Sequence, residues 1–252
     1  MNRFIFASRY ARRHLLLSVL VGCLSAATVF GLLYPPPFQH MLGASQVFVL
    51  LLAVDVVCGP LLTLVLASPR KSRQALWIDW SLIGTVQIIA LLYGLHAVWI
   101  ARPAVLAFEV DRLMVATANE VQIQDLSQAP QGMRSLPWWG VMPVHTRAPK
   151  DANETFEALE LGMAGISPAM RPSWWLPWKK AQSAMAQRMQ PVMDLLQRRP
   201  QEAARLQVAI QKTKLPLDQL YYLPLTSSKT RDYVILLDSD LNQVGWAEID
   251  GF

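Results

Sequence analysis

Residues 47–67 read VFVLLLAVDVVCGPLLTLVLA, an apolar run that contains one formal charge, at Asp55. A helix rises about 1.5 Å per residue, so a run of this length can cross a hydrocarbon core about 30 Å thick. Similar apolar runs lie before and after it in the sequence. We therefore expect three transmembrane helices, at about residues 14–34, 46–67 and 80–101.

Charged residues divide the chain at the same place. Residues 14–101 hold only five formal charges, whereas residues 102–252 hold sixteen basic and sixteen acidic side chains. We expect a membrane domain over residues 1–101 and a water-exposed domain over residues 102–252. The net charge of +5 comes from basic residues at the ends of the expected helices. There they would meet anionic membrane lipids, so we do not expect nucleic-acid binding.

The positions of the basic residues predict the orientation of the chain. Within residues 1–101 the basic residues lie in the N-terminal arm and in the loop 68–73, and the loop 35–40 has none. Because basic loops stay in the cytoplasm, we expect a cytoplasmic N-terminus and, after three crossings, a periplasmic C-terminal domain.

An alternative interpretation is a lipoprotein signal peptide, because Leu20-Val21-Gly22 precedes Cys23. A polar tether usually follows a lipidated cysteine, but residues 24–33 stay apolar. One continuous span fits this pattern better. The C-terminal domain would lie outside in either case.

Residues 102–252 have the mixed pattern of an α+β domain. Residues 104–116 predict a strand with residues 121–126 as its hairpin partner, and residues 127–151 predict a loop rich in Pro, Gly and Trp. Two or three short helices are expected over residues 177–214 and a final hairpin over residues 232–249.

A further helix is expected at about residues 152–163. Asp151 and Glu154 have the spacing of a helix cap. Phe156, Leu159 and Met163 then recur at helical intervals.

The sequence contains no motif for catalysis or metal binding. Its histidines have no Cys, Asp or Glu at metal-ligand spacing, and there is no nucleophile elbow, phosphate-binding glycine loop or zinc-protease motif. We expect no cofactor, no metal and no enzymatic activity. An inner-membrane enzyme with a dispersed site is the alternative, because a catalytic triad can assemble from distant residues.

Asp55 is the most informative candidate for a binding residue. An ionised carboxylate in the middle of a span costs roughly 2.5–3.5 kcal/mol, so it needs compensation. Asp55 is either neutral, or paired with Gln87 or another polar group in the third span, or paired with the transmembrane helix of a partner. Gly59 and Pro60 follow one turn later, and we expect Pro60 to kink the helix and free a backbone carbonyl.

Two pairs of tryptophans are the other candidates for partner contacts: Trp138-Trp139 and Trp174-Trp175. If exposed, each pair would form a patch suited to a membrane surface or a partner protein. If buried, each pair belongs to the core of the domain. The sequence leaves both alternatives open.

Several segments resemble the type IV pilin accessory proteins. The resemblance is strongest over residues 34–112 and includes Tyr34-Pro35-Pro36-Pro37-Phe38, Asp55-Val-Val-Cys-Gly59-Pro60-Leu-Leu-Thr63, Gln87, and Arg102-Pro103. It extends, more weakly, to the final hairpin.

This resemblance implies an inner-membrane protein of a bacterium that assists a type IV pilin. Such a protein would act as a chaperone-like factor in pilin stability or pilus assembly, with other pilus assembly proteins as further partners. The rival hypothesis is a membrane-tethered periplasmic sensor or ligand-binding module.

Overall fold

The computed structural model describes residues 3–252, so residues 1 and 2 of the expected membrane domain lie outside the described residues. The chain divides between Ala101 and Arg102 into two compact units, which are described separately.

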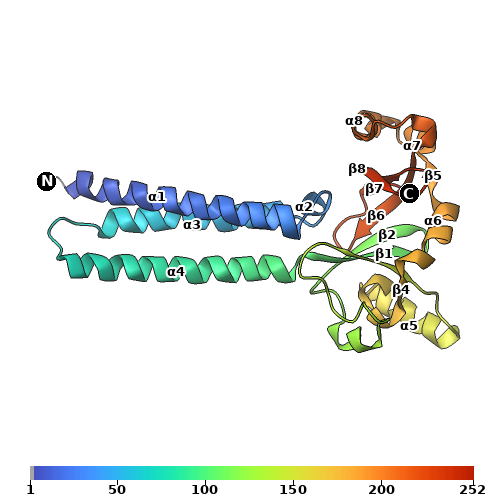
Figure 1. Cartoon of the computed structure of the whole chain (residues 1–252), viewed down its shortest axis with the longest axis horizontal. Helices are drawn as coiled ribbons and strands as arrows, with labels where there is room; N and C mark the ends of the chain where they lie inside the picture. Colours follow the sequence, from blue (N-terminus) through green and yellow to red (C-terminus); the bar gives the residue numbers. More distant parts are fainter. Residues whose placement is uncertain (1–2) are drawn as a thin grey trace. The chain divides into compact units, whose positions relative to one another are not determined.

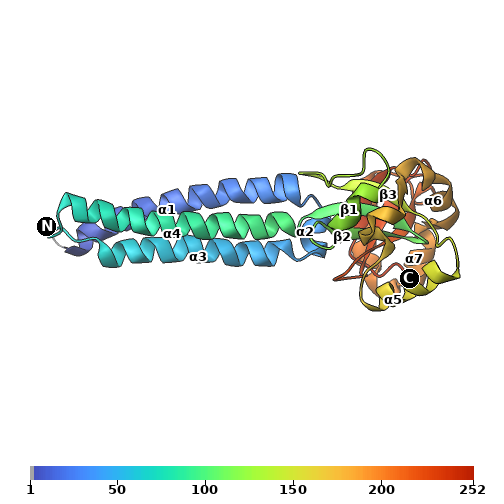
Figure 2. The ribbon, with the colours of Figure 1, turned by 90° about the horizontal axis from the view of Figure 1, so that it is seen from below.

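The N-terminal unit is a bundle of long helices that run side by side (Figures 1 and 2). Its elements are α1 (Arg3–Thr28) with a π-helical end (Val29–Leu33), α2 (Phe38–Met41), α3 (Ala44–Leu66) and α4 (Arg73–Ile100). Within residues 3–252, three helices are long and apolar enough to cross a membrane: Arg3–Leu33, α3 and α4.

All three helices begin before the expected spans, α3 by only two residues, at Ala44. α1 starts at Arg3, and α4 starts after Ser72, whose side chain accepts a hydrogen bond from the Ala75 amide at 3.2 Å. The starts of α1 and α4, for which the basic residues predict a cytoplasmic location, are therefore helical turns that carry charge. α3 continues as a helix through Pro60.

Small residues let the helices of this unit approach closely. A methyl group added at Gly94 of α4 would lie 2.8 Å from Leu51 Cγ of α3.

Aromatic side chains also connect these helices. Phe30 and Phe48 meet edge to face at 5.3 Å between ring centroids. The Tyr34 hydroxyl donates to the Val98 carbonyl at 2.9 Å, which ties the end of the first helix to α4.

The C-terminal unit is built on one mixed sheet. Residues 102–252, all of which are described, form eight strands in the order β4-β3-β1-β2-β6-β7-β8, with β5 paired to β6. The strands are β1 (Pro103–Glu109), β2 (Arg112–Thr117), β3 (Met142–Thr146), β4 (Trp175–Pro177), β5 (Gln190–Pro191), β6 (Tyr221–Ser227), β7 (Tyr233–Leu237) and β8 (Gln243–Ala247). β1 pairs with β3, and β2 with β6, in parallel, and the other pairs are antiparallel.

Short helices complete this unit, and with the three long helices they confirm the predicted fold class. They are α5 (Ala152–Met163), α6 (Gln182–Arg188), α7 (Val192–Arg198) and α8 (Ala203–Thr213). Single 3₁₀ turns occur at Ile123–Gln128, Pro168–Met170, Pro172–Trp174, Trp178–Lys180, Pro200–Glu202 and Leu217–Gln219. Pro191 directly precedes α7 and Pro200 opens the 3₁₀ turn before α8, as their missing amide hydrogens favour.

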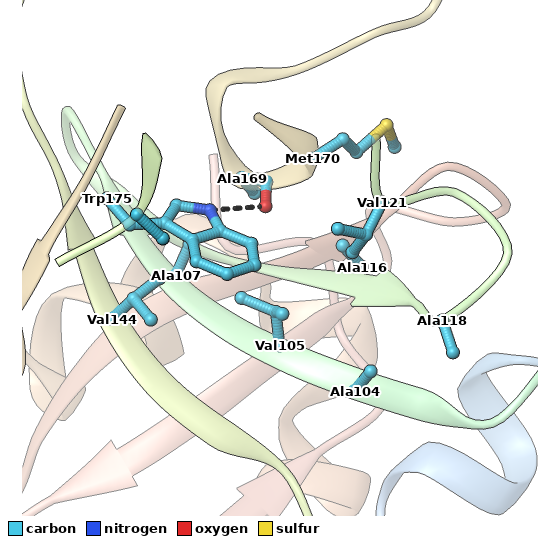
Figure 3. Packing of buried hydrophobic residues seen from close by; sticks show 11 residues of the cluster. Ala104, Val105, Ala107, Ala116, Ala118, Val121, Val144, Ala169, Met170 and Trp175 are labelled. Carbon is cyan, nitrogen blue, oxygen red and sulfur yellow. Dashed lines mark hydrogen bonds between the residues drawn. The ribbon is translucent and has the colours of Figure 1, made fainter. Parts of the chain in front are cut away.

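The hydrophobic core of this unit has two clusters of buried side chains. Figure 3 shows the cluster around Trp175, whose indole lies over Val105 and Val144 of the sheet. Its Nε1–H donates to the Ala169 carbonyl at 2.9 Å, so burying the ring leaves no unpaired indole donor. The second cluster contains Leu195 of α7 and Leu206 of α8 together with residues of β6, β7 and β8.

Two predictions for the start of this domain were wrong. The first hairpin lies within residues 104–116 themselves, because the chain turns at Val110-Asp111 between β1 and β2. The charged residues in that run mark a two-residue turn. Residues 121–126, the expected hairpin partner, form no strand and instead enter a 3₁₀ turn.

β3 was also not expected, because its sequence lies in a segment rich in turn-forming residues and contains Pro143. Proline cannot donate to a strand ladder. Pro143 is tolerated because the pairing of β3 with β4 begins only at Val144. The final hairpin, β7 and β8, is as predicted, and the Asp238 carboxylate accepts hydrogen bonds from the turn amides of Asp240 and Asn242 at 2.9 and 2.8 Å.

Candidate functional site

The N-terminal unit contains four polar residues that meet between its helices. We define the polar cluster as His14 of α1, Asp55 and Thr63 of α3, and Gln87 of α4. Asp55, Gly59 and Thr63 are spaced four residues apart on α3, so they lie in one row along that helix. Asp55 is the twelfth of the 23 residues of α3, and the cluster therefore starts near the middle of a span.

Gly59 makes room for Gln87. A methyl group added at Gly59 would come within 2.6 Å of both Cδ and Oε1 of the Gln87 side chain. Without that methyl group, the Gln87 amide lies against the backbone of α3 and its Nε2–H donates to the Asp55 carbonyl at 2.9 Å. The candidate residues Gly59 and Gln87 are thus brought together by the structure.

His14 connects α1 to the other two helices. Its Nε2 lies 2.7 Å from Gln87 Oε1 and its Nδ1 lies 2.6 Å from Thr63 Oγ1. Because Gln87 Nε2 donates to a carbonyl, Gln87 Oε1 is the atom that faces His14 and must accept. His14 Nε2 therefore carries a hydrogen, and in the neutral ring Nδ1 accepts from the Thr63 hydroxyl.

A groove opens beside the polar cluster, with a volume of about 220 Å³. It is lined by His14, Leu17, Ser18, Val21, Gly22, Leu52, Asp55, Gly84, Gln87, Ile88 and Leu91. Gly84 contributes to the opening, because a methyl group added there would meet no atom within 4 Å. A second cavity of about 290 Å³ also reaches His14 and is lined by Tyr10, Arg13, His14, Leu17, Thr63, Trp80 and Gly84.

The Asp55 carboxyl lines the groove without a protein partner. It is half-buried, and among residues 3–252 it makes no hydrogen bond or ion pair. Gln87 binds the main-chain carbonyl of Asp55, not the carboxyl. An intramembrane carboxyl that faces a groove can accept a hydrogen bond, or a cation, from a molecule that enters it.

Sequence reasoning missed His14 and Thr63. His14 was assigned only to the end of the first span, and Thr63 appeared only within an apolar run and in the motif that carries the family resemblance. The row of Asp55, Gly59 and Thr63 at intervals of four residues is the signal that could have identified Thr63. No comparable signal identifies His14, because its partners are 49 and 73 residues away in the sequence.

The two tryptophan pairs differ in their surroundings. Trp138 and Trp139 are 71% and 70% exposed, whereas Trp174 and Trp175 are both 2% exposed. Trp174 and Trp175 therefore belong to the core, which is one of the two alternatives that the sequence allowed. Trp138 and Trp139 lie at the surface of the C-terminal unit, which is the other alternative.

The described residues contain no group of three His, Cys, Asp or Glu that could hold a metal ion.

These features define a membrane-anchored protein with three apolar helices, a polar groove between them and a separate α+β domain. The chain belongs to the family of fimbrial assembly proteins. It is 32% identical to the fimbrial assembly protein of serogroup I from Dichelobacter nodosus, over 252 residues that make up 100% of this chain and 98% of that protein. It is 31% identical to the serogroup E1 protein over the same shares of both chains.

Two further comparisons agree with this assignment. The serogroup C1 and C2 protein of the same organism is 38% identical over 128 residues, which are 51% of this chain and 98% of that protein. The family described as fimbrial assembly protein FimB matches residues 2–43. No solved structure matches the chain significantly. The predicted resemblance to proteins of type IV pilus assembly is thereby confirmed.

Proposed function

We propose that this protein is a chaperone-like accessory factor for a type IV pilin at the bacterial inner membrane, and that it supports pilin stability or pilus assembly without catalysis. The observation that carries the proposal is the similarity to fimbrial assembly proteins along the whole chain. In this proposal the N-terminus is cytoplasmic and residues 102–252 are periplasmic, because the basic residues near the membrane lie in the N-terminal arm and the loop between α3 and α4.

The groove beside Asp55 supports this role physically. A type IV pilin before assembly is a single-span protein with its globular head outside, so a factor that assists it needs contacts within the bilayer and in the periplasm. The carboxyl of Asp55 is available to a neighbouring helix, because no residue within the described chain binds it. A hydrogen bond across helices in a membrane contributes about 0.6 kcal/mol on average, so several such contacts would give reversible binding.

Deletion of the gene tests the function. We expect lower pilin abundance or less surface piliation, with normal growth, and we expect the wild-type gene to restore both. Normal pilin and pili together with a metabolic defect would contradict the proposal and favour the enzyme alternative. Normal pilin and pili with altered expression of other genes would favour a sensor.

Substitution of Asp55 tests the groove. Asp55→Leu removes the desolvation cost, so the protein should accumulate at least as well as wild type, while crosslinking to the pilin in membranes should fall. Val57→Leu is the matched control, because Val57 is a 52% exposed apolar residue on the same helix.

Asp55→Asn separates two forms of recognition. An ionised carboxylate predicts weaker crosslinking for both Asp55 variants, whereas a neutral hydrogen bond predicts that Asn is tolerated. If Asp55→Leu accumulates normally and captures pilin at the wild-type level, Asp55 takes no part in recognition.

A further inference from the structure

Helix α5 of the C-terminal unit turns three large apolar side chains outward, while Leu161 is half-buried on its other side. Phe156, Leu159 and Met163 are 72%, 61% and 77% exposed, and no residue of α5 is buried. At about 100° per residue these three side chains fall within an arc of roughly 60° on the helix surface. An amphipathic helix of a globular domain normally packs such a stripe against the core. No element within residues 3–252 covers this stripe.

The opposite side of α5 is held to the domain by polar contacts. Glu154 forms two hydrogen bonds with the Arg147 guanidinium, at 2.6 and 2.9 Å, and Glu157 pairs with Arg171. Both arginines stack on the Trp174 ring, each with Cζ 4.6 Å from its centroid. These ion pairs fix the rotation of the helix about its axis, so the apolar stripe is held outward.

The charges on α5 restrict what can cover the stripe. The helix carries Glu154, Glu157 and Glu160 and no Lys or Arg. A helix that binds an anionic membrane surface has basic residues on its polar face, which α5 does not. A second copy of α5 laid stripe to stripe against the first would bring another Glu160 to the interface and no basic residue to pair with it. Both charge patterns disfavour these occupants.

We propose that α5 is a docking helix that places Phe156, Leu159 and Met163 in an apolar groove of another protein, and that Lys or Arg at the rim of that groove pairs with Glu160. The three anchors have the i, i+3, i+7 spacing by which amphipathic helices enter grooves. Glu160 is exposed on the flank next to Phe156 and has no side-chain hydrogen bond or ion pair within residues 3–252. The inference concerns a surface of the C-terminal unit and does not depend on the identity of the partner as a pilin.

Photo-crosslinking of the full-length protein in its native membranes tests this docking helix. A benzoylphenylalanine at position 156 or 163 should form an adduct with one protein, and the crosslinked peptide should map to an apolar groove with Lys or Arg at its rim. Glu160→Lys should lower the adduct yield about two- to fivefold, the range expected for one exposed ion pair. Reversing the mapped basic residue of the partner to Glu should restore the yield in that variant.

Controls separate this result from nonspecific crosslinking and from misfolding. Val208 of α8 is a matched control position, because it is a 54% exposed apolar residue on another helix of the same unit. Position 92 of α4, where Leu92 is 61% exposed in a membrane-spanning helix, should give lipid adducts and shows that the photochemistry works. Adducts from position 156 with lipid or with a second copy of this chain would overturn the proposal. So would the absence of an adduct, or an adduct whose yield ignores the charge reversal.

Discussion

The hydrogen bonds of Gln87 allow a quantitative test of the polar cluster. Gln87→Ala removes two hydrogen bonds between helices, one to His14 and one to the Asp55 carbonyl. At about 0.6 kcal/mol for each, the variant should lose about 1.2 kcal/mol, which is roughly an eightfold change in the unfolding equilibrium. Removing the side chain alone does not separate these bonds from lost packing, so the test needs a second position.

Gly59 is that position, since a methyl group there collides with the Gln87 amide. Gly59→Ala improves helix propensity by about 1 kcal/mol but should displace Gln87 and lose its bonds, so the net effect in the wild-type background is close to zero. In the Gln87→Ala background the collision is absent, and Gly59→Ala should stabilise by about 1 kcal/mol. The double-mutant cycle should therefore give a coupling energy of about 1.2 kcal/mol.

The two cysteines of the chain supply the assay. Cys23 on α1 and Cys58 on α3 are both exposed, so a donor and an acceptor dye attached to them report the separation of these helices during unfolding in mixed detergent micelles. Gly84→Ala is the matched control, because its methyl group meets no atom within 4 Å and should stabilise in either background. A coupling energy between positions 59 and 87 within about 0.3 kcal/mol of zero, the range for independent sites, would refute the bonding of Gln87 across helices.

Three further predictions concern orientation and the C-terminal unit. Reporter fusions after Ser72 should give a cytoplasmic signal and fusions after Arg102 a periplasmic one; a cytoplasmic signal beyond Arg102 would contradict the proposed orientation. Hydrogen bonds from the Arg147 side chain and the Lys150 amide lower the pKa of Glu154 from 4.5 to about 2. The contribution of the ionised Glu154 carboxylate to holding α5 against the domain is therefore complete above pH 4.5 and is lost as the pH falls toward 2. The protection of α5 amides from hydrogen exchange, relative to an unstructured peptide at the same pH, should therefore fall over that window in wild type but change little in Glu154→Gln. Trp175→Ala should destabilise the domain by about 3–5 kcal/mol in denaturant unfolding, whereas Trp139→Ala should stay within about 0.5 kcal/mol; equal losses would contradict their different burial.

Local patterns predicted the elements that depend mainly on nearby residues. The three membrane helices follow from apolar length, and the final hairpin follows from two apolar runs around Asp238 and its turn. The bounds of α5 also follow from local signals, because Asp151 accepts a hydrogen bond from the Glu154 amide as a helix cap should. In place of the reciprocal bond of a capping box, the Glu154 carboxylate binds Arg147 and the Lys150 amide.

Elements that depend on distant partners could not be predicted in this way. β3 is a strand because β1 and β4 pair with it on either side, and its own sequence, with Pro143, gives no strand signal. The hydrophobic periodicity of α5 predicted a helix but not which side would face the domain. That choice is made by Arg147 and Arg171, which lie before and after the helix in the sequence and reach its glutamates.

Residues distant in the sequence also decide whether the Asp55 carboxyl has a partner within the protein. From the sequence, Gln87 was a natural partner for the carboxyl, because both are polar residues in adjacent spans. In the structure Gln87 has other partners. Its Oε1 accepts a hydrogen bond from His14 Nε2, and its Nε2 donates to the main-chain carbonyl of Asp55. The Gln87 side chain thereby links α1, α3 and α4. It does not bind the Asp55 carboxyl, which lines the groove. Gln87 contributes hydrogen bonds between helices, so Gln87→Ala should lower the free energy of unfolding. The Asp55 carboxyl has no partner within the described chain, so Asp55→Leu should instead lower crosslinking to the pilin.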